Sequence, residues 1–387
     1  MAHFEMDRFL KLVLAIQQIP APTFSEGKRA AFIHDRFLDE GLADVEVDSS
    51  GNVLGRLPGE NSKQFVVVSA HLDTVFSEDV DLKVREENGI IRAPGIGDNA
   101  MGLAGLFGLV WKLSSYDSIA FPSNMDREKQ GLNKVLRTSL PGDVWLVANV
   151  REEGLGDLFG MRKVVERFGA QPKAYIVVEG MSLGQVYHRG LGVRRYRIFT
   201  RTPGGHSWVD FGKPSAIHEL ANLITHLTEI PLPKHPRSSI NVGVISGGTS
   251  VNTIAPEAYL ELDLRSEDQG TLVNLIQKVE ELLIEVNRGD VHVTCEVIGD
   301  RPVGELDHQH PLVLKAVQAN KSVGLVPALN VGSTDANIPL SQGLPAVCVG
   351  ITTGGGAHTL DEYINIQPID QGLEQLVKLI ISVFEEG

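Results

Sequence analysis

The chain has 387 residues, of which 42% are hydrophobic and 22% are charged, and at about 150 residues per domain this length predicts two or three domains. These ordinary globular proportions exclude collagen, a coiled coil or disorder as a description of the whole chain. The 49 acidic residues against 35 basic ones give a formal net charge of −14. That excess argues against nucleic acid and anionic membrane as partners, because both attract basic surfaces.

The first apolar stretch and the number of cysteines bear on the cellular location of the protein. The apolar stretch 10–16 is interrupted by Lys11, whereas a secretory signal needs a longer apolar run and a membrane span needs about 20 apolar residues. It predicts an amphipathic helix. Cys295 and Cys348 are too few for a disulfide framework in a chain of this length. We therefore expect a cytoplasmic protein.

Four apolar runs of strand length are typical of parallel strands buried on both faces. They occupy residues 65–70, 144–150, 174–178 and 346–351. Helical periodicity lies between them, at 103–113 and around 161–168, and the polar stretch 114–143 predicts a long loop or a loop that contains a short helix. Strands that alternate with helices in this way predict an α/β fold with a wound, mostly parallel sheet.

Metal-ligating residue types follow each of these four strands. In wound sheets, ligands bind beyond the carboxyl ends of the strands. A hydrolytic two-metal site needs His, Asp and Glu ligands, one carboxylate shared between the ions, and an unligated base for the water. The candidates are His71, Asp73, Asp98, Glu152, Glu153, Glu179 and His358.

The spacing of these candidates suggests a division of roles. His71 and Asp73 lie two residues apart, so one can bind a metal ion while the other holds the second imidazole nitrogen. Glu152 and Glu153 are adjacent, and two adjacent side chains do not readily face one ion. We therefore expect one ligand and one free base from this pair, and the spacing alone does not say which is which.

The stretch 191–303 has a different hydrophobic pattern. Strand patterns at 193–201, 239–246, 258–265 and 291–298 alternate with helical patterns near 214–228 and at 270–287. The order β-α-β-β-α-β is the split βαβ, or ferredoxin-like, arrangement. Because the buried-strand pattern resumes near 344, we predict a discontinuous catalytic metal-binding domain, 1–190 and 304–387, with residues 191–303 inserted into it.

Seven motifs occur in order along nearly the whole chain: SAHLDTV (69–75), GIGDNAMG (95–102), VREEG (150–154), VVEG (177–180), GGHS (204–207), SVNTIAPEA (250–258) and GGGAHTLDEYI (354–364). With these motifs the chain resembles the dinuclear zinc metallopeptidases that include peptidase T, glutamate carboxypeptidase, acetylornithine deacetylase and the aminoacylases. The resemblance implies a zinc-peptidase-like catalytic domain. It also implies that the inserted domain is a lid and dimerisation domain of a homodimer.

The resemblance assigns a role to each matching residue of the catalytic domain. It implies two Zn²⁺ ions per subunit, for which Co²⁺ or Mn²⁺ can substitute. His71 and Glu179 would bind the first ion, and Glu153 and His358 the second. Asp98 would bridge the ions from a turn that often carries a cis peptide bond, here Asp98–Asn99. Asp73 would orient His71, and Glu152 would be the general base.

In the inserted domain, the resemblance implies that His206 polarises the scissile carbonyl, commonly that of the partner subunit. Asn252, Arg265 and Arg301 would hold the substrate. Two positions depart from the family pattern. Many relatives have a second acid where this chain has Asn99, and Asp where it has Glu179. These departures leave the subfamily open.

Other motifs in the chain are weaker indications of function. Residues 95–100 fit the dinucleotide fingerprint G-x-G-x-x-A, but that fingerprint must follow a buried strand. Here Pro94 precedes it, and Asn88-Gly89 predicts a hairpin turn. The sequence GHSWV lacks the closing glycine of the serine-hydrolase elbow. Asp335 has two interpretations, as a residue that orients a ligand or as a helix cap.

The sequence therefore predicts a two-domain zinc hydrolase that cleaves a peptide or N-acyl amide bond. An aminopeptidase acting on short peptides is favoured over a carboxypeptidase. A deacylase of N-acyl amino acids is the alternative within the hydrolases. The alternative from another class is a non-catalytic relative that binds a ligand or partner, and the intact set of metal ligands and base argues against it.

Overall fold

A computed structural model of the chain describes residues 5–120 and 136–385. The chain divides into two compact units. The discontinuous unit comprises Met1–Arg189 and Glu305–Gly387, and the inserted unit comprises Gly190–Gly304. In the described parts of the chain, no helix has both the length and the apolar character needed to cross a membrane.

The discontinuous unit is built on a nine-stranded sheet of order β1-β2-β6-β3-β7-β17-β8-β15, with β16 paired to β8. Its four central strands β6, β3, β7 and β17 run parallel, and they are the four strands predicted from the apolar runs. The mostly parallel wound sheet is thereby confirmed. The strands are β1 (Ala43–Val47), β2 (Val53–Leu57), β3 (Phe65–His71), β6 (Asp143–Asn149), β7 (Tyr175–Glu179), β8 (Gln185–Gly190), β15 (Gly304–Glu305), β16 (Ala328–Gly332) and β17 (Ala346–Gly350).

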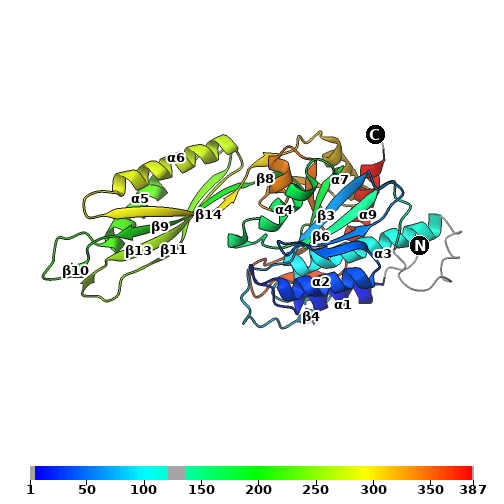
Figure 1. Cartoon of the computed structure of the whole chain (residues 1–387), viewed down its shortest axis with the longest axis horizontal. Helices are drawn as coiled ribbons and strands as arrows, with labels where there is room; N and C mark the ends of the chain where they lie inside the picture. The colour runs from blue at the N-terminus through cyan, green and yellow to red at the C-terminus, as the bar shows by residue number, and fades with distance from the viewer. Residues whose placement is uncertain (1–4, 121–135, 386–387) are drawn as a thin grey trace. The chain divides into compact units, whose positions relative to one another are not determined.

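Helices pack against this sheet along its width (Figure 1). Helix α3 contacts β3 and β7, α2 contacts β1 and β2, α4 contacts β6, and α7 contacts β17. Helices α1 and α9 pack on α3. The helices are α1 (Met6–Gln17), α2 (Gly27–Asp39), α3 (Gly102–Ala120), α4 (Phe159–Phe168), α7 (Pro311–Ser322), α8 (Asn337–Ser341) and α9 (Ile369–Phe384).

The loop predicted at 114–143 is wrong at its start, because α3 continues to Ala120. No glycine or proline stands between 114 and 120 to end the helix. The hydroxyls of Ser114 and Ser115 donate to the carbonyls of Val110 and Trp111 one turn earlier in the helix. Residues 121–135 of the predicted loop lie outside the described residues.

A second, small sheet of order β18-β19-β5-β4 lies beside the carboxyl end of the main sheet's central strands. It joins β5, which precedes the turn at Asp98, to β19, which follows His358. The hairpin expected at Asn88-Gly89 is confirmed, since both residues have positive φ between the paired strands β4 and β5. The strands are β4 (Arg85–Glu87), β5 (Ile90–Arg92), β18 (Gly354–Gly355) and β19 (Tyr363–Asn365).

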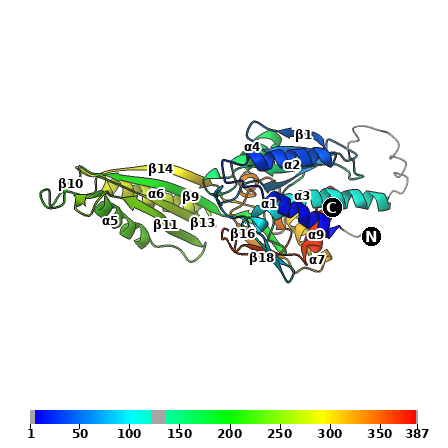
Figure 2. The ribbon, with the colours of Figure 1, turned by 90° about the horizontal axis from the view of Figure 1, so that it is seen from below.

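The inserted unit has the predicted β-α-β-β-α-β order, and its sheet is antiparallel with the order β11-β13-β9-β14. Helices α5 and α6 contact each other and both contact β9 and β13, so they cover the same face (Figures 1 and 2). Leu260, Leu262 and Leu264 are buried under them. The elements are β9 (Gly192–Arg201), α5 (Ala216–Glu229), β11 (Ser238–Gly247), β13 (Glu257–Ser266), α6 (Gln269–Val286) and β14 (His292–Arg301).

The contact of α9 with the end of β17 leaves no room for a side chain at Gly372. A Cβ there would lie 1.8 Å from the backbone oxygen of Ile351. We expect Gly372→Ala to lower the free energy of unfolding by about 1–3 kcal/mol, through overpacking. The matched control is Gly27→Ala in α2, where a Cβ meets nothing within 4 Å and stability should hold or rise. Urea unfolding of both variants measures this, and equal stability of the two would contradict the close contact.

Candidate metal centre

The seven candidate residues of the discontinuous unit lie at the carboxyl end of its parallel strands. His71 ends β3, Glu179 ends β7, and Glu152 and Glu153 follow β6. Asp98 lies in the irregular turn Ile96–Met101 that leads into α3, and His358 lies in the loop between β18 and β19. Because parallel strands end at one edge of a sheet, side chains distant in sequence meet there.

Asp98 stands between two histidines, and its two oxygens face different ones. Its Oδ1 is 3.0 Å from His71 Nε2, and its Oδ2 is 3.1 Å from His358 Nε2. Glu179 completes the first group, with 3.7 Å between its Oε2 and His71 Nε2. Glu153 completes the second, with 3.1 Å between its Oε1 and His358 Nε2. The result is two possible metal-binding groups with one carboxylate in common.

Glu152 occupies a different place from its neighbour Glu153. Among the possible metal-binding groups in the described residues, Glu152 joins only His71 and Glu153. It is 5% exposed, so it lies within the same buried cluster. A carboxylate that is close to both groups and belongs to neither Asp98-containing group has the position of a free base.

The turn that carries Asp98 is fixed by its neighbour Asn99. The peptide bond between them is cis, as expected. The buried Asn99 amide donates to the carbonyl of Val178 in β7 at 3.0 Å, and its oxygen accepts from the backbone N–H of Gly102 at 3.1 Å. An aspartate here would lack the donor for Val178. The departure from the family's second acid therefore has a structural reason in this chain.

Asp73 does more than the sequence predicted. The Nδ1 of His71 lies 3.1 Å from the backbone oxygen of Asp73 and 3.5 Å from its carboxylate. The carboxylate accepts the backbone N–H groups of Glu152 and Glu153, one on each oxygen, both at 2.9 Å. Asp73 thus fixes the backbone of both glutamates as well as the ring of His71. This second role depends on β3 and β6 being neighbours in the sheet. Hydrophobic periodicity predicts the strands but not their order in the sheet, so the sequence did not reveal it.

The ionisation of the cluster shows a strongly negative environment. Burial raises the pKa of Glu153 and of Glu179 to about 7. Burial would also raise the pKa of Asp98, but hydrogen bonds with His358 and His71 outweigh it and hold this pKa below its ordinary value. Hydrogen bonds with Asp98 and Glu153 raise the pKa of His358 to about 10. In the metal-free chain, the imidazolium of His358 therefore partly balances the buried carboxylates.

The donor set fits divalent metal ions. Imidazole nitrogen and carboxylate oxygen are ligands of Zn²⁺, and they also accept Mn²⁺ and Co²⁺. Two cations held on either side of Asp98 would supply the positive charge that the protonated imidazole of His358 supplies without them. Within the described residues, neither cysteine belongs to a possible metal-binding group.

The four predicted residues of the inserted unit fall into two pairs. His206 lies in β10 (Gly205–His206), which pairs with β12 (Thr253–Ile254), and Asn252 is beside it, since its carbonyl accepts from Ser207 N–H at 3.0 Å. Arg265 and Arg301 lie at the opposite end of β9, where both pair with Val193. The ten residues of β9 span about 30 Å, so the structure does not bring the four together.

The exposure of these residues also differs. His206 is exposed, and its Nδ1 accepts the backbone N–H of Trp208 at 3.2 Å. An Nδ1 that accepts leaves the proton of a neutral ring on Nε2. Arg265 is half-buried and donates to Asp263 at 2.6 Å, whereas Arg301 is 4% exposed.

Two buried acids lie near the centre, Asp335, which the sequence left with two interpretations, and Glu362, to which it gave no role. The interpretation of Asp335 as a helix cap is wrong, since Ala336 is the N-cap of α8 and no side chain caps it. Asp335 is instead fully buried and accepts from Asn149 at the end of β6, at 2.7 Å. Glu362, four residues after His358, contacts the turn of Asp98. Neither contact leaves a local sequence signal, because each joins distant segments.

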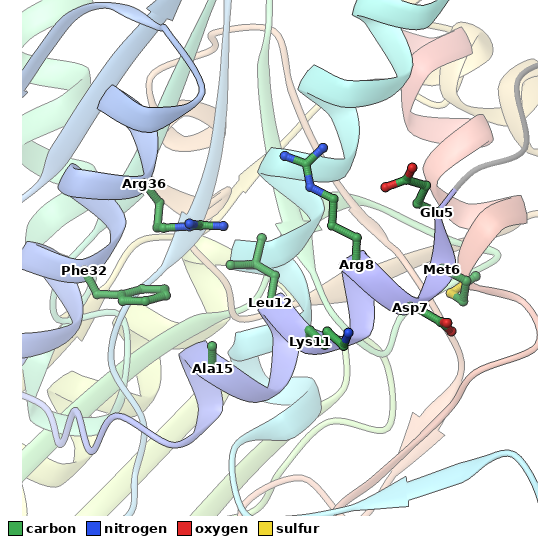
Figure 3. Close-up of a pocket in the computed structure, with 9 residues that line it drawn as sticks. All are labelled: Glu5, Met6, Asp7, Arg8, Lys11, Leu12, Ala15, Phe32 and Arg36. Atoms are coloured by element: carbon green, nitrogen blue, oxygen red, sulfur yellow. The ribbon is translucent and has the colours of Figure 1, made fainter.

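A hollow of about 740 Å³ lies elsewhere in this unit, between α1 and α2 (Figure 3). Both acidic and basic side chains line it, together with apolar ones. None of the seven candidate residues is among them, so this hollow is not part of the metal centre. The lining residues are Glu5, Met6, Asp7, Arg8, Lys11, Leu12, Ala15, Phe32 and Arg36.

Comparison with known families matches both units. The profile of the M20 peptidase dimerisation domain matches residues 192–291, and the profile of peptidase family M28 matches residues 52–128. Peptidase T of Vibrio cholerae is 25% identical over 377 residues, which cover 90% of this chain and 89% of that protein. The chain is similar to the M20 metallopeptidases, and its inserted unit matches their dimerisation domain. The resemblance drawn from the motifs is confirmed, and the enzyme class is hydrolase.

Two further proteins are similar to the chain along most of its length. The N-formyl-4-amino-5-aminomethyl-2-methylpyrimidine deformylase of Bacillus subtilis is 24% identical over 374 residues, covering 86% of this chain and 82% of that protein. A tripeptidase from Staphylococcus aureus has a similar structure, with a TM-score of 0.78 at 20% identity, covering 99% of this chain and 100% of that one. The fold is therefore shared along the whole chain.

The carboxylate of Asp73 offers a direct test of how the two glutamates are held. In Asp73→Asn, one oxygen becomes an NH₂ group that cannot accept a backbone N–H. We expect the affinity for Zn²⁺ to fall about 10–100-fold, as for other residues that hold metal ligands in place. Competition with a chromophoric chelator measures it.

The matched control is Asp48→Asn, since Asp48 also accepts two backbone N–H groups, from Ser50 and Asn52. It lies before β2 and belongs to none of the possible metal-binding groups. Its zinc affinity should equal that of the wild type. An Asp73→Asn variant that binds zinc as tightly as this control would show that Asp73 does not hold the glutamates.

Proposed function

We propose that this chain hydrolyses peptide bonds of short peptides through two divalent metal ions, with Zn²⁺ as the expected metal. The observation that carries the proposal is the position of Asp98, with one oxygen in each of two His-carboxylate groups. His71 and Glu179 would hold one ion, and Glu153 and His358 the other. Asp98 would bind both.

Such a pair of ions supplies a water of lowered pKa and stabilises the oxyanion that develops on the substrate. Glu152 would move the proton. It would accept a proton from the attacking water and deliver it to the leaving nitrogen, a role worth roughly 10²–10⁴-fold in rate. Asp73 supports this role, because it holds the backbone of Glu152 in place.

The inserted unit would act as lid and dimerisation domain, giving a homodimer, and the dimerisation-domain match supports this. His206 would donate from Nε2 to the scissile carbonyl, and its exposed ring with an accepting Nδ1 suits that task. Loss of such a donor typically costs about 10²–10³-fold in rate. Asn252, Arg265 and Arg301 would bind other parts of the substrate.

An aminopeptidase that acts on short peptides is favoured, and the similarity to peptidase T and to a tripeptidase supports it. The second candidate is an N-acyl amide deacylase, which the deformylase relative supports at nearly the same identity. A non-catalytic relative remains the third, and the complete set of ligands and base argues against it. We place the protein in the cytoplasm, on the strength of its two unpaired cysteines.

A panel of four substrates separates these candidates. The panel contains a tripeptide with free ends, the same tripeptide N-acetylated, the same tripeptide C-amidated, and an N-acyl amino acid. An aminopeptidase should cleave the free and amidated peptides, and a carboxypeptidase the free and acetylated ones. All turnover should stop with a chelator and return with Zn²⁺ or Co²⁺. Absence of metal-dependent turnover on every substrate would favour the non-catalytic relative.

The variant Glu152→Gln tests the base. It keeps the size of the side chain and removes its ability to accept the proton, so kcat should fall by about 10²–10⁴-fold. Elemental analysis should still find two ions per chain, because Glu152 is not expected to be a ligand. Wild-type turnover by this variant would overturn the assignment.

The variant His358→Ala provides the contrasting result. It removes a ligand of one ion only, so elemental analysis should find one equivalent fewer than in the wild type. Two retained equivalents would show that His358 is not a ligand.

A further inference from the structure

Glu362 is a fully buried glutamate whose side chain is directed at the turn of Asp98. Its Oε1 accepts the backbone N–H of Gly97 at 2.7 Å and that of Asp98 at 2.8 Å. Its Oε2 accepts the backbone N–H of Gly95 at 3.1 Å. Three N–H groups of one short turn thus converge on a single carboxylate.

Such converging N–H groups form an anion-binding concavity of the kind that elsewhere binds phosphate. Gly95, whose φ of +69° favours glycine, contributes one of these N–H groups. A side chain of the chain itself fills the concavity. Because burial removes water as an alternative partner, each of the three donors depends on Glu362.

Glu362 also joins the two segments that carry Asp98 and His358. It lies between His358 and β19, and its backbone oxygen accepts the N–H of Ala93 at 3.0 Å. Two residues further on, Ile364 of β19 pairs with Ile91 of β5. One residue therefore connects the Asp98 turn to the His358 loop through both its side chain and its backbone.

The consequence concerns the geometry around Asp98. The two oxygens of Asp98 lie 3.0 and 3.1 Å from His71 and His358, and the backbone of Asp98 is held at its N–H by Glu362. Release of this contact would free the turn to move away from His358. Because Asp98 belongs to both of its possible metal-binding groups, both would be disturbed.

We propose that Glu362 is a positioning residue of the metal centre. It holds Asp98 between the two ions and keeps it in register with His358, so the affinity for both ions depends on it. This inference rests on the proposed function, since it concerns the same metal centre, and it adds a residue outside the predicted ligand set.

The test uses the full-length chain and three variants. In Glu362→Gln the amide oxygen can keep two N–H donors, but its NH₂ group faces the third. Glu362→Ala removes all three contacts, and Glu362→Asp keeps a shortened carboxylate. Competition with a chromophoric chelator gives the zinc affinity, and the visible spectrum of the Co²⁺-loaded protein reports the coordination of the ions.

We expect zinc affinity to fall at least tenfold in Glu362→Gln and further in Glu362→Ala, with a changed Co²⁺ spectrum. Glu362→Asp should recover part of the loss. If Glu362→Ala does not fold, the nearly isosteric Gln variant carries the test. The thermal midpoint of each metal-free variant is measured alongside, so that a loss of zinc affinity is distinguished from a loss of folded protein.

The matched control is Asp143→Asn. Asp143 is also a buried carboxylate, and it accepts the backbone N–H of Gly59 at 2.8 Å at the start of β6, the end away from Glu152. This variant should lose stability and keep wild-type zinc affinity.

Two different outcomes would contradict the account, one the role of Glu362 alone and the other the proposed function as well. If the wild type binds two zinc ions and the Glu362 variants bind them equally well, Glu362 only supports the fold and the inference is wrong. If the wild type itself binds no zinc, the proposed function fails, and the inference fails with it.

Discussion

The cost of burying several carboxylates in one cluster is the constraint on which the discontinuous unit depends. The fold places acids from three parallel strands and a turn within one cluster, with side chains that are mostly removed from water. A buried charge is costly unless it is paired or hydrogen-bonded. The pKa of Glu153 and of Glu179 rises to about 7 for that reason. The cluster is therefore stable only with compensation, and its surroundings provide it in two ways.

The first compensation is a set of backbone N–H donors. Asp73 accepts those of Glu152 and Glu153, and Glu362 accepts three from the turn of Asp98. These bonds do not neutralise charge, but they fix where each carboxylate lies. The second compensation is positive charge, from the imidazolium of His358 in the metal-free chain and from divalent cations in the proposed enzyme. A fold that holds acids together in this way is one prepared to bind cations.

Sequence reasoning found the parts of this arrangement that local pattern encodes. Apolar runs identified the four central strands, and the charged residues after them identified the edge where they meet. It failed where a residue acts through a distant segment. Glu362 is 264 residues from Asp98, and Asp335 is 186 residues from Asn149, so neither contact has a spacing that a single sequence displays. Helix α3 runs past its predicted end, because no glycine or proline stands between 114 and 120 to stop it.

In the inserted unit, the residues expected to contact the substrate lie far apart. His206 and Asn252 lie about 30 Å along β9 from the arginines at its other end, whereas a tripeptide spans only about 10 Å. One short substrate cannot contact both pairs within the same inserted unit. A homodimer, as the dimerisation-domain match supports, is consistent with this separation, since it offers a second copy of each pair.

The central claim is that Asp98 is shared between two metal ions, and anomalous diffraction at the zinc absorption edge tests it most directly. Crystals of the zinc-loaded protein should show two peaks about 3.5–4 Å apart. One peak should lie beside His71 and Glu179, and the other beside Glu153 and His358, with Asp98 between them. A single peak, or a pair of peaks that Asp98 does not separate, would contradict the account.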